Sequence, residues 1–307
     1  MARKLIVAQP HGFCAGVRRA VATVGAVLAA HPGETVYVFN EIVHNRAVVD
    51  GFRRRGVRFV HDLDEVPEGA VLIFSAHGVS SGVEAAAAAR RLRVVDATCP
   101  LVTALHRQAR ALAEAGKQVI LIGHPEHPEV IGTLGRLPES ARKLVADTPE
   151  RAAGLPAVAG EAVVLTQTTL NERAITPVLE ALRRRFGRDL ELDNRHCYAT
   201  ENRQNAVRML AAKCERILVI GSEHSSNSRE LCAVAEASDC LASLIDSPSD
   251  IDFAALENVE TLGLSAGASA PPELFDATLK LLAEHGFDRI ETVCAAEEKQ
   301  DFPMPAV

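Results

Sequence analysis

The sequence predicts an α/β protein made of three related parallel-sheet modules in a trefoil-like arrangement around a shared centre. Short β-branched apolar runs alternate with helical patterns along the chain. Cys14, Cys99 and Cys197 each stand where a strand region gives way to a helix, and each opens a further set of strand–helix units. The modules are expected at residues 1–98, 99–193 and 194–284, with the C-terminal segment 285–307 packed on the first.

The predicted strands are continuous apolar runs, which is typical of parallel strands that are buried on both faces. The clear runs are 5–8, 36–39, 71–74, 94–97, 119–122, 162–165, 217–220 and 262–265, and the weaker ones are 143–146, 241–246 and 291–294. Because helical patterns separate these runs, the strands are expected to form parallel sheets.

The predicted helices begin close to residues that carry chemistry. After Cys14, apolar residues recur at helical spacing, at Val17, Val21, Val24 and Leu28. Pro100 suits the first turn of the helix after Cys99, because its missing N–H has no helical partner to lose there. Thr200 is expected to cap a helix that starts at Glu201.

Charge and composition limit the partners of the chain. Its 307 residues carry a formal net charge of −7, without the basic surplus typical of nucleic-acid binding. No apolar run is long enough for a membrane span or a signal peptide, so we expect a cytoplasmic protein whose thiols stay reduced. The arginine clusters within 53–55, 90–93 and 183–185 are either solvated helix faces or a docking face for an acidic partner.

Polar residues gather where the predicted strands end, which is the edge at which parallel α/β sheets bind ligands. They are Cys14, His44, His77, Cys99, His124, His127, Glu129, Thr168, Ser225, Ser226, Asn227 and Ser269. A scaffold needs only turns and caps at these points, so we interpret the set as a functional site.

The cysteines allow two interpretations. Each one alone is most simply a small buried residue, but a helix N-terminus favours the thiolate that a metal or cluster requires. Gly12 and Gly16 would let the backbone around Cys14 approach a bulky ligand closely. The sequence has no C-x-x-C, which excludes a zinc ribbon or a ferredoxin-type run. Four further cysteines are interpreted as structural, namely Cys214, Cys232, Cys240 and Cys294.

The histidines and serines also have structural alternatives. His44, His77 and His127 are either satisfied structural histidines or hydrogen-bond donors to phosphate oxygens. The serine-rich helix start at 225–227 and the turn at Ser269 are either plain caps or anion-binding helix ends. No G-x-x-x-x-G-K-[ST] motif is present, so a nucleotide P-loop is excluded.

Glu129 is the best acid/base candidate. It follows a proline at a predicted helix start, where the alternative is a first-turn carboxylate stabilised by the helix dipole. Thr168 alone is equally ambiguous. His124 and His127 are three residues apart, but the prolines beside them argue against a regular helical zinc pair.

Nine motifs in order resemble the 4-hydroxy-3-methylbut-2-enyl diphosphate reductase family, also called LytB. They are G-F-C-A-G-V, V-H-N, F-S-A-H-G-V, D-A-T-C-P-L-V, G-H-x-x-H-P-E-V, T-Q-T-T-L, C-Y-A-T-x-N-R-Q, S-S-N-S and A-G-A-S-A-P. The resemblance covers nearly the whole chain, from Leu5 to about Pro271.

The resemblance implies a [4Fe–4S] cluster bound by Cys14, Cys99 and Cys197, with one iron open to the substrate hydroxyl. It implies that the diphosphate is held by His44, His77, His127, Ser225, Ser226, Asn227 and Ser269. Thr168 and Glu129 would bond near the hydroxyl, with Glu129 supplying protons. The implied reaction reduces (E)-4-hydroxy-3-methylbut-2-enyl diphosphate to isopentenyl and dimethylallyl diphosphate, the last step of the non-mevalonate isoprenoid pathway. Ferredoxin or flavodoxin would supply the electrons.

Two positions depart from the family pattern. His224 stands where asparagine is usual, and His196 stands where an aliphatic residue is usual. Neither replaces a ligand, but both bear on reduction potential and pH dependence. Two other functions stay open: an iron–sulfur hydro-lyase, which needs no sustained electron supply, and a non-catalytic iron–sulfur sensor or phosphate-binding module.

Overall fold

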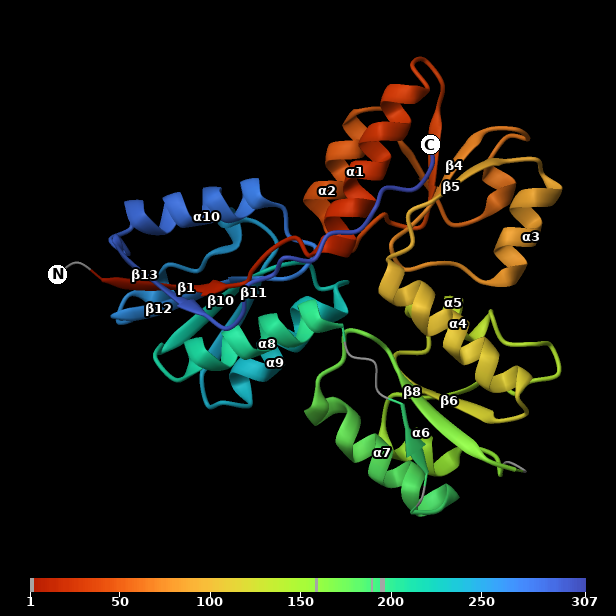
Figure 1. Ribbon diagram of the computed structural model, residues 1–307. Helices are drawn as coiled ribbons and strands as arrows, with labels where there is room; N and C mark the ends of the chain where they lie inside the picture. The colour runs from red at the N-terminus through yellow and green to blue at the C-terminus, as the bar shows by residue number, and fades with distance from the viewer. Residues whose placement is uncertain (1–2, 158–159, 189, 194–196) are drawn as a thin grey trace. The chain divides into compact units, whose positions relative to one another are not determined.

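The described strands lie in three parallel sheets, each covered by helices (Figure 1). The computed structural model describes residues 3–157, 160–188, 190–193 and 197–307. Every strand pairing in this part of the chain is parallel, so the predicted α/β class with parallel-sheet modules is confirmed. The chain divides into two compact units: residues 1–18, 43–54 and 198–301 form the first, and residues 19–42, 55–197 and 302–307 form the second.

The first unit contains a five-stranded sheet in the order β11-β10-β12-β1-β13. Its strands are β1 (Lys4–Gln9), β10 (Arg216–Ile220), β11 (Leu241–Ile245), β12 (Thr261–Ala266) and β13 (Arg289–Cys294). The first strand of the chain therefore lies between two of the last, with Ile6 opposite both Gly263 and Glu291.

Helices cover both faces of this sheet, with α10 on one side and α8 and α9 on the other (Figure 1). The helices of the unit are α2 (Arg46–Arg54), α8 (Tyr198–Ala211), α9 (Ser226–Glu236) and α10 (Pro272–Glu284), with 3-10 turns at Pro248–Asp250 and Ala254–Leu256. Leu5 shares a core with Phe275 of α10, whereas Ile6 shares the opposite core with Leu210 of α8. Since neighbouring side chains of a strand face opposite sides, an uninterrupted apolar run fills both cores.

The second unit contains two four-stranded sheets, in the orders β3-β2-β4-β5 and β7-β6-β8-β9. The first sheet consists of β2 (Val36–Phe39), β3 (Arg58–Val60), β4 (Val71–Phe74) and β5 (Arg93–Asp96), and the second of β6 (Gln118–Ile122), β7 (Leu144–Ala146), β8 (Ala162–Thr166) and β9 (Glu191–Leu192). The helices are α1 (Ala15–Ala30), which begins in the first unit, α3 (Ser81–Ala89), α4 (Pro100–Glu114), α5 (Pro128–Leu134), α6 (Pro149–Gly154) and α7 (Glu172–Phe186), with a 3-10 turn at Leu63–Glu65.

The second of these sheets is also covered on both faces. Ile120 of β6 packs in one core with Leu182 of α7, and Leu121 packs in the other core with Leu105 of α4. Alternate residues of one apolar strand therefore pack against the helices on opposite faces of the sheet. The strands end, in turn, at the loops that carry the polar residues of the site.

One local expectation about the helices is wrong. Helix α8 begins at Tyr198, so Thr200 is a buried residue of its first turn and not the cap. The predicted helix after Cys14 is confirmed as α1, in which Ala20, Thr23, Val24 and Val27 are fully buried.

The expected domain limits stay a prediction. The limits after residues 98 and 193 fall between strands of different sheets, namely β5 and β6, and β9 and β10. Strand β1, however, belongs to the sheet of the last strands, and β13 pairs with it. The C-terminal part of the chain thus packs on the first strand of the sequence.

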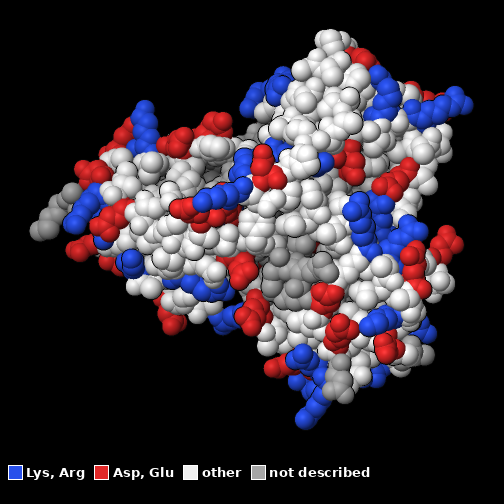
Figure 2. All heavy atoms as spheres, viewed as in Figure 1, with Lys and Arg blue, Asp and Glu red and all other residues white. Residues whose placement is uncertain are grey.

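Surface charge is mixed on the face shown in Figure 2, where lysine and arginine side chains alternate with aspartate and glutamate. Among the described residues, no helix combines the length and the apolar character that a bilayer crossing requires. Helix α2 ends in Arg53 and Arg54, and Arg53 donates to Asp50 at 3.0 Å. Basic residues in a last turn also stabilise the helix dipole, so this cluster has a structural role of its own.

Candidate functional site

Glu129 and Thr168 form a buried pair in the second unit. Glu129 lies in the first turn of α5, and Thr168 follows the end of β8. The Thr168 backbone N–H donates to Glu129 Oε1 at 2.7 Å, and its hydroxyl donates to Oε2 at 2.8 Å. Burial raises the pKa of the Glu129 carboxyl, and the two bonds from Thr168 oppose that shift. The result is a carboxylic acid that holds its proton beyond the ordinary range, which suits a proton donor.

His127 is oriented by the same helix start. It is the N-cap of α5, and its Nδ1 accepts the backbone N–H of Glu129 at 3.2 Å. A ring nitrogen that accepts carries no proton, so the neutral ring carries its proton on Nε2. The His77 ring meets His127 edge-on, with 5.6 Å between centroids. The structure therefore brings four of the predicted site residues together here, two histidines beside an acid and a threonine.

Two buried side chains that the sequence did not single out support this cluster. Gln167, directly before Thr168, accepts the His124 backbone N–H on Oε1 and donates to Thr169, both at 3.0 Å. It thereby joins the turns that follow β6 and β8. His106 of α4 packs below the loop of His77, and burial lowers its pKa to about 4, so it is neutral near pH 7. Gln167 lies inside the T-Q-T-T-L motif, next to Thr168, and that motif is the signal that could have found it. No quoted motif contains His106, whose contacts with the loop of His77 are distant in sequence.

The first unit holds the predicted serine and asparagine residues. Ser225 caps α9, since its Oγ accepts the Ser228 backbone N–H at 3.3 Å. Ser226 and Asn227 follow in the first turn and are buried. Asn227 is only 5% exposed, yet none of the described residues hydrogen-bonds to either atom of its amide. A buried amide without partners is costly unless a ligand satisfies it.

His44 and Ser269 belong to the same unit and are joined directly. The Ser269 hydroxyl donates to the His44 backbone oxygen at 2.9 Å. Gly267, two residues before Ser269, lies beside Asn227: a Cβ atom there would be 3.4 Å from Nδ2. The loop after β12 thus connects the start of α9 to the loop that carries His44.

The three candidate cysteine ligands each precede a helix. Cys14 stands directly before α1, Cys99 is the N-cap of α4, and Cys197 stands directly before α8. All three are partly exposed, whereas Cys214 and Cys240 are buried, and burial raises the pKa of Cys214 to about 12.

The donor chemistry of these three thiols therefore fits a thiolate-bound cluster. Their convergence stays a prediction, because Cys14 belongs to the first unit and Cys99 to the second. Within the described ranges, no group of three or more His, Cys, Asp or Glu side chains is arranged as a metal site.

Of the two departures from the family pattern, the structure describes His224. His224 is exposed in the turn before Ser225, and its backbone N–H donates to Ser222 Oγ at 3.3 Å. The backbone of His224 therefore lies at the edge of the serine-rich helix start. His196 lies outside the described residues.

This fold and site define a class of protein, namely a parallel α/β enzyme with a buried acid and several thiols at helix starts. The chain belongs to the LytB family, since the family model described as "LytB protein" matches residues 5–283. The predicted family is thereby confirmed.

Similar proteins agree with this assignment. The chain is 45% identical over 305 residues to the 4-hydroxy-3-methylbut-2-enyl diphosphate reductase of Actinobacillus succinogenes, covering 98% of this chain and 97% of that protein. It is 46% identical over 304 residues to the reductase of the same name from Burkholderia pseudomallei, with 99% and 96% covered. The solved E-1-hydroxy-2-methyl-but-2-enyl-4-diphosphate reductase of Plasmodium falciparum superposes with a TM-score of 0.93 at 32% identity, covering 99% of this chain and 96% of that chain.

Proposed function

We propose that this chain reduces (E)-4-hydroxy-3-methylbut-2-enyl diphosphate to isopentenyl and dimethylallyl diphosphate. The substrate loses its hydroxyl as water and takes up two electrons and two protons. The observation that carries the proposal is the buried acid Glu129, whose two carboxyl oxygens are both bonded to Thr168. Relatives that are 45% and 46% identical to this chain are named 4-hydroxy-3-methylbut-2-enyl diphosphate reductase, which supports the proposal.

Glu129 and Thr168 would deliver a proton to the leaving hydroxyl. In the protonated state, Glu129 Oε2–H donates to Thr168 Oγ1, and the threonine hydroxyl proton is released to a new acceptor. That acceptor is the substrate oxygen, which leaves as water once it is protonated. Burial keeps Glu129 protonated at a higher pH than an exposed glutamate. Glu129 would therefore carry a proton when the substrate binds.

Hydrogen-bond donors would hold the diphosphate. His127 presents Nε2–H because its Nδ1 is already bonded, and His77 stands at its edge. The start of α9 offers Ser225, Ser226 and the unsatisfied amide of Asn227, and the N-terminal dipole of that helix favours an anion. His44 and Ser269 complete the proposed set.

Cys14, Cys99 and Cys197 would hold a [4Fe–4S] cluster. When bound, such a cluster supplies electrons and a Lewis-acidic iron for the leaving oxygen. The chain would contribute three thiolates, each presented at a helix start. Ferredoxin or flavodoxin is the expected electron donor.

Anaerobic purification followed by visible and Mössbauer spectroscopy, and then turnover with the allylic diphosphate and dithionite, tests the proposal. A [4Fe–4S] spectrum and reductant-dependent formation of the two isomeric diphosphates are expected. Product formation without any reductant would instead indicate a hydro-lyase. Diphosphate binding without turnover, with the cluster intact and reduced, would indicate a sensor or a binding module.

A further inference from the structure

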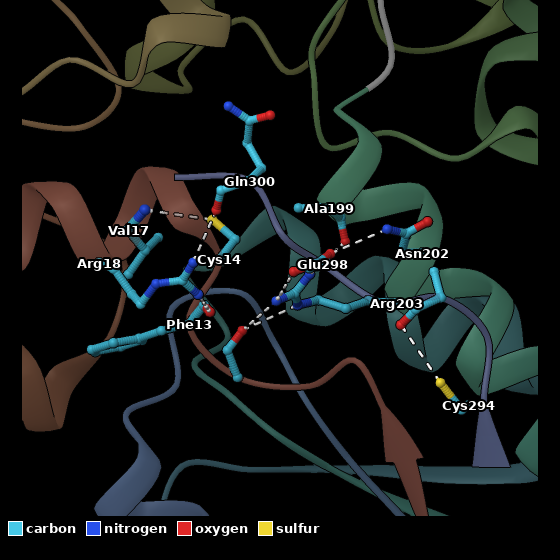
Figure 3. A network of polar contacts seen from close by, with 12 residues as sticks. Phe13, Cys14, Val17, Arg18, Ala199, Asn202, Arg203, Cys294, Glu298 and Gln300 are labelled. Carbon is cyan, nitrogen blue, oxygen red and sulfur yellow. Dashed lines mark hydrogen bonds and ion pairs between the residues drawn. The ribbon is translucent and has the colours of Figure 1, made fainter. Parts of the chain in front are cut away.

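A buried arginine holds the loop that leads to Cys14. Arg203 lies in the middle of α8 and is 1% exposed. Its Nη2 and Nε donate to the backbone oxygen of Gly12 at 2.8 and 3.1 Å, and Nη1 donates to the backbone oxygen of Ala199 at 2.8 Å (Figure 3). Three nitrogens of one guanidinium therefore bind backbone on either side, which fixes the distance between α8 and the loop.

The carboxylate that neutralises Arg203 comes from the C-terminal segment after β13. Glu298 Oε1 accepts from Arg203 Nη1 at 2.9 Å and Oε2 accepts from Nη2 at 3.3 Å. Asn202 Nδ2 also donates to Oε1, at 3.3 Å. The Glu298 side chain is 8% exposed, so both charges are largely removed from water. A buried guanidinium needs such a partner to remain in place.

The opposite side of the same loop is also fixed. The Gly12 backbone N–H donates to the oxygen of Ala266 at 3.1 Å, and the Cys14 N–H donates to that of Ala268 at 3.3 Å. Gly12 has a φ of +64°, and a Cβ atom there would lie 3.2 Å from the Ala270 oxygen. The loop is therefore held between the turn after β12 and Arg203, two residues before the Cys14 thiol.

The helix that carries Arg203 also follows a second candidate cluster ligand, Cys197. It begins at Tyr198, directly after Cys197, so the helix that anchors the Gly12 oxygen is also the helix that Cys197 precedes. The Cys14 Sγ itself accepts the Val17 backbone N–H at 3.4 Å. The Arg203 guanidinium thus binds the backbone before Cys14 to the helix that follows Cys197.

A similar contact occurs at the loop before Cys99, in the second unit. Arg19 of α1 donates through Nη1 to the backbone oxygen of Thr98 at 3.0 Å and through Nε to that of Pro303 at 2.7 Å. Here too an arginine binds both the cysteine loop and the C-terminal segment. Residues near the C-terminus therefore accept hydrogen bonds from both arginines that bind a cysteine loop.

We propose that Arg203 and Glu298 are positioning residues of the cluster site: Glu298 holds the Arg203 guanidinium, which fixes the loop that presents Cys14. This inference rests on the proposed function, in which Cys14 is a cluster ligand. The bare alternative is a buried ion pair that contributes to folding alone. Such pairs are often replaceable without loss of stability, so stability does not identify their role.

Glu298→Gln tests this proposal, because the amide keeps the size of the side chain and loses its charge. Glu291→Gln is the matched control: it breaks the 2.6 Å pair with Lys4 in the same unit and touches no cysteine loop. Both variants are purified anaerobically, and their thermal unfolding is compared with that of the natural chain. Cluster loss to a chelator is followed by visible absorbance. Alkylation of Cys14 by iodoacetamide is followed in cluster-free protein by peptide mass spectrometry, with exposed Cys294 as the internal reference.

Glu298→Gln should lose the cluster about tenfold faster than the natural chain, as other supporting residues around metal sites do. Alkylation of Cys14 should rise several-fold relative to Cys294, and Glu291→Gln should change neither quantity. If Glu298→Gln does not fold, Glu298→Asp carries the test, since it keeps the charge and withdraws it from the guanidinium. It should show the same changes to a smaller extent.

Wild-type rates of cluster loss and of Cys14 alkylation in a folded Glu298 variant would overturn the proposal. Equal changes in Glu291→Gln would also overturn it, because the effect would then be general loosening. A natural chain that never binds a cluster would contradict the proposed function instead. The alkylation rates of the cluster-free chain would still decide the role of Glu298 in that case.

Discussion

At the scale of single residues, Glu129 shows how burial and hydrogen bonding act on one proton. Burial disfavours its charged form, while the N–H and hydroxyl of Thr168 favour it. Burial is the larger effect, so the pKa lies above the ordinary value of 4.5. The folded chain thus binds this proton more tightly than the unfolded chain does.

Glu129→Gln should lower turnover by about 100-fold or more while leaving the visible spectrum of the cluster unchanged, because a relay donor is removed from an intact site. Steady-state rates with dithionite and the spectrum measure both quantities. Full activity in this variant would exclude Glu129 from proton delivery.

The same variant should change stability in a pH-dependent way. Since the folded-state pKa is raised, the cost of ionising Glu129 is absent below pH 4.5 and grows as pH rises toward the folded-state pKa. Glu129→Gln should therefore be more stable than the natural chain at pH 8 and not at pH 4.5, as measured by denaturant unfolding. A constant difference between these pH values would contradict the raised pKa.

Asn227→Leu should separate binding from stability. The variant replaces a buried amide that has no partner among the described residues, so it should raise the free energy of unfolding by about 1 kcal/mol while increasing KM for the diphosphate. Asn171→Leu is the matched control, because the Asn171 amide accepts the Ala174 N–H at 2.8 Å as the cap of α7. That change should cost about 1 kcal/mol. A destabilised Asn227→Leu with normal KM would refute the assignment of Asn227 to the substrate.

At the scale of elements, the strands follow from the sequence because a strand buried on both faces must be apolar at every position. The helix starts at Pro100, Pro128 and Ser226 could also be predicted from the sequence. Proline is favoured in a first turn and serine at a cap, and both preferences depend on local sequence alone. The short strands β3 and β9 were missed. Arg58 and Glu191 begin them with exposed side chains, and neither strand is long enough to show a pattern.

Gly78→Ala should show how tightly the loop of His77 is held. Gly78 has a φ of +73°, and a Cβ atom would lie 2.6 Å from Cε1 of His106. Gly69 has nearly the same φ, +72°, with open space around it. Gly69→Ala should therefore cost about 1 kcal/mol for the backbone alone, and Gly78→Ala should cost clearly more. Denaturant midpoints measure both changes in stability. Equal losses of stability would show that the loop of His77 moves to accommodate the added Cβ atom.

At the scale of the whole molecule, the sequence placed each candidate residue at a strand end or helix start, which is where the structure has them. It could not find the contacts that connect distant segments, such as Arg203 with Gly12 and Glu298. Those contacts depend on β1 pairing with β12 and β13, and no local pattern specifies that pairing. His106 escaped notice because its contacts with the loop of His77 also join segments that are distant in sequence.

Reversing the charge of Arg53 to Arg55 with glutamate should slow ferredoxin-dependent turnover and leave the dithionite-dependent rate unchanged. An acidic electron carrier would lose an attractive surface, and the remaining rate should depend less on salt. Rates with both reductants over a range of ionic strength check this. If the ferredoxin-dependent rate does not change, these arginines only stabilise and solvate the end of α2.

The proposed function requires that Cys14, Cys99 and Cys197 together bind one iron–sulfur cluster. Iron and sulfide content and the visible absorption of three single variants, Cys14→Ala, Cys99→Ala and Cys197→Ala, test it most directly, with Cys294→Ala as the control. Each of the three should lose the cluster band and most of its iron after anaerobic purification, while the control keeps both. Retention of a full cluster by any one of the three folded variants would contradict the claim.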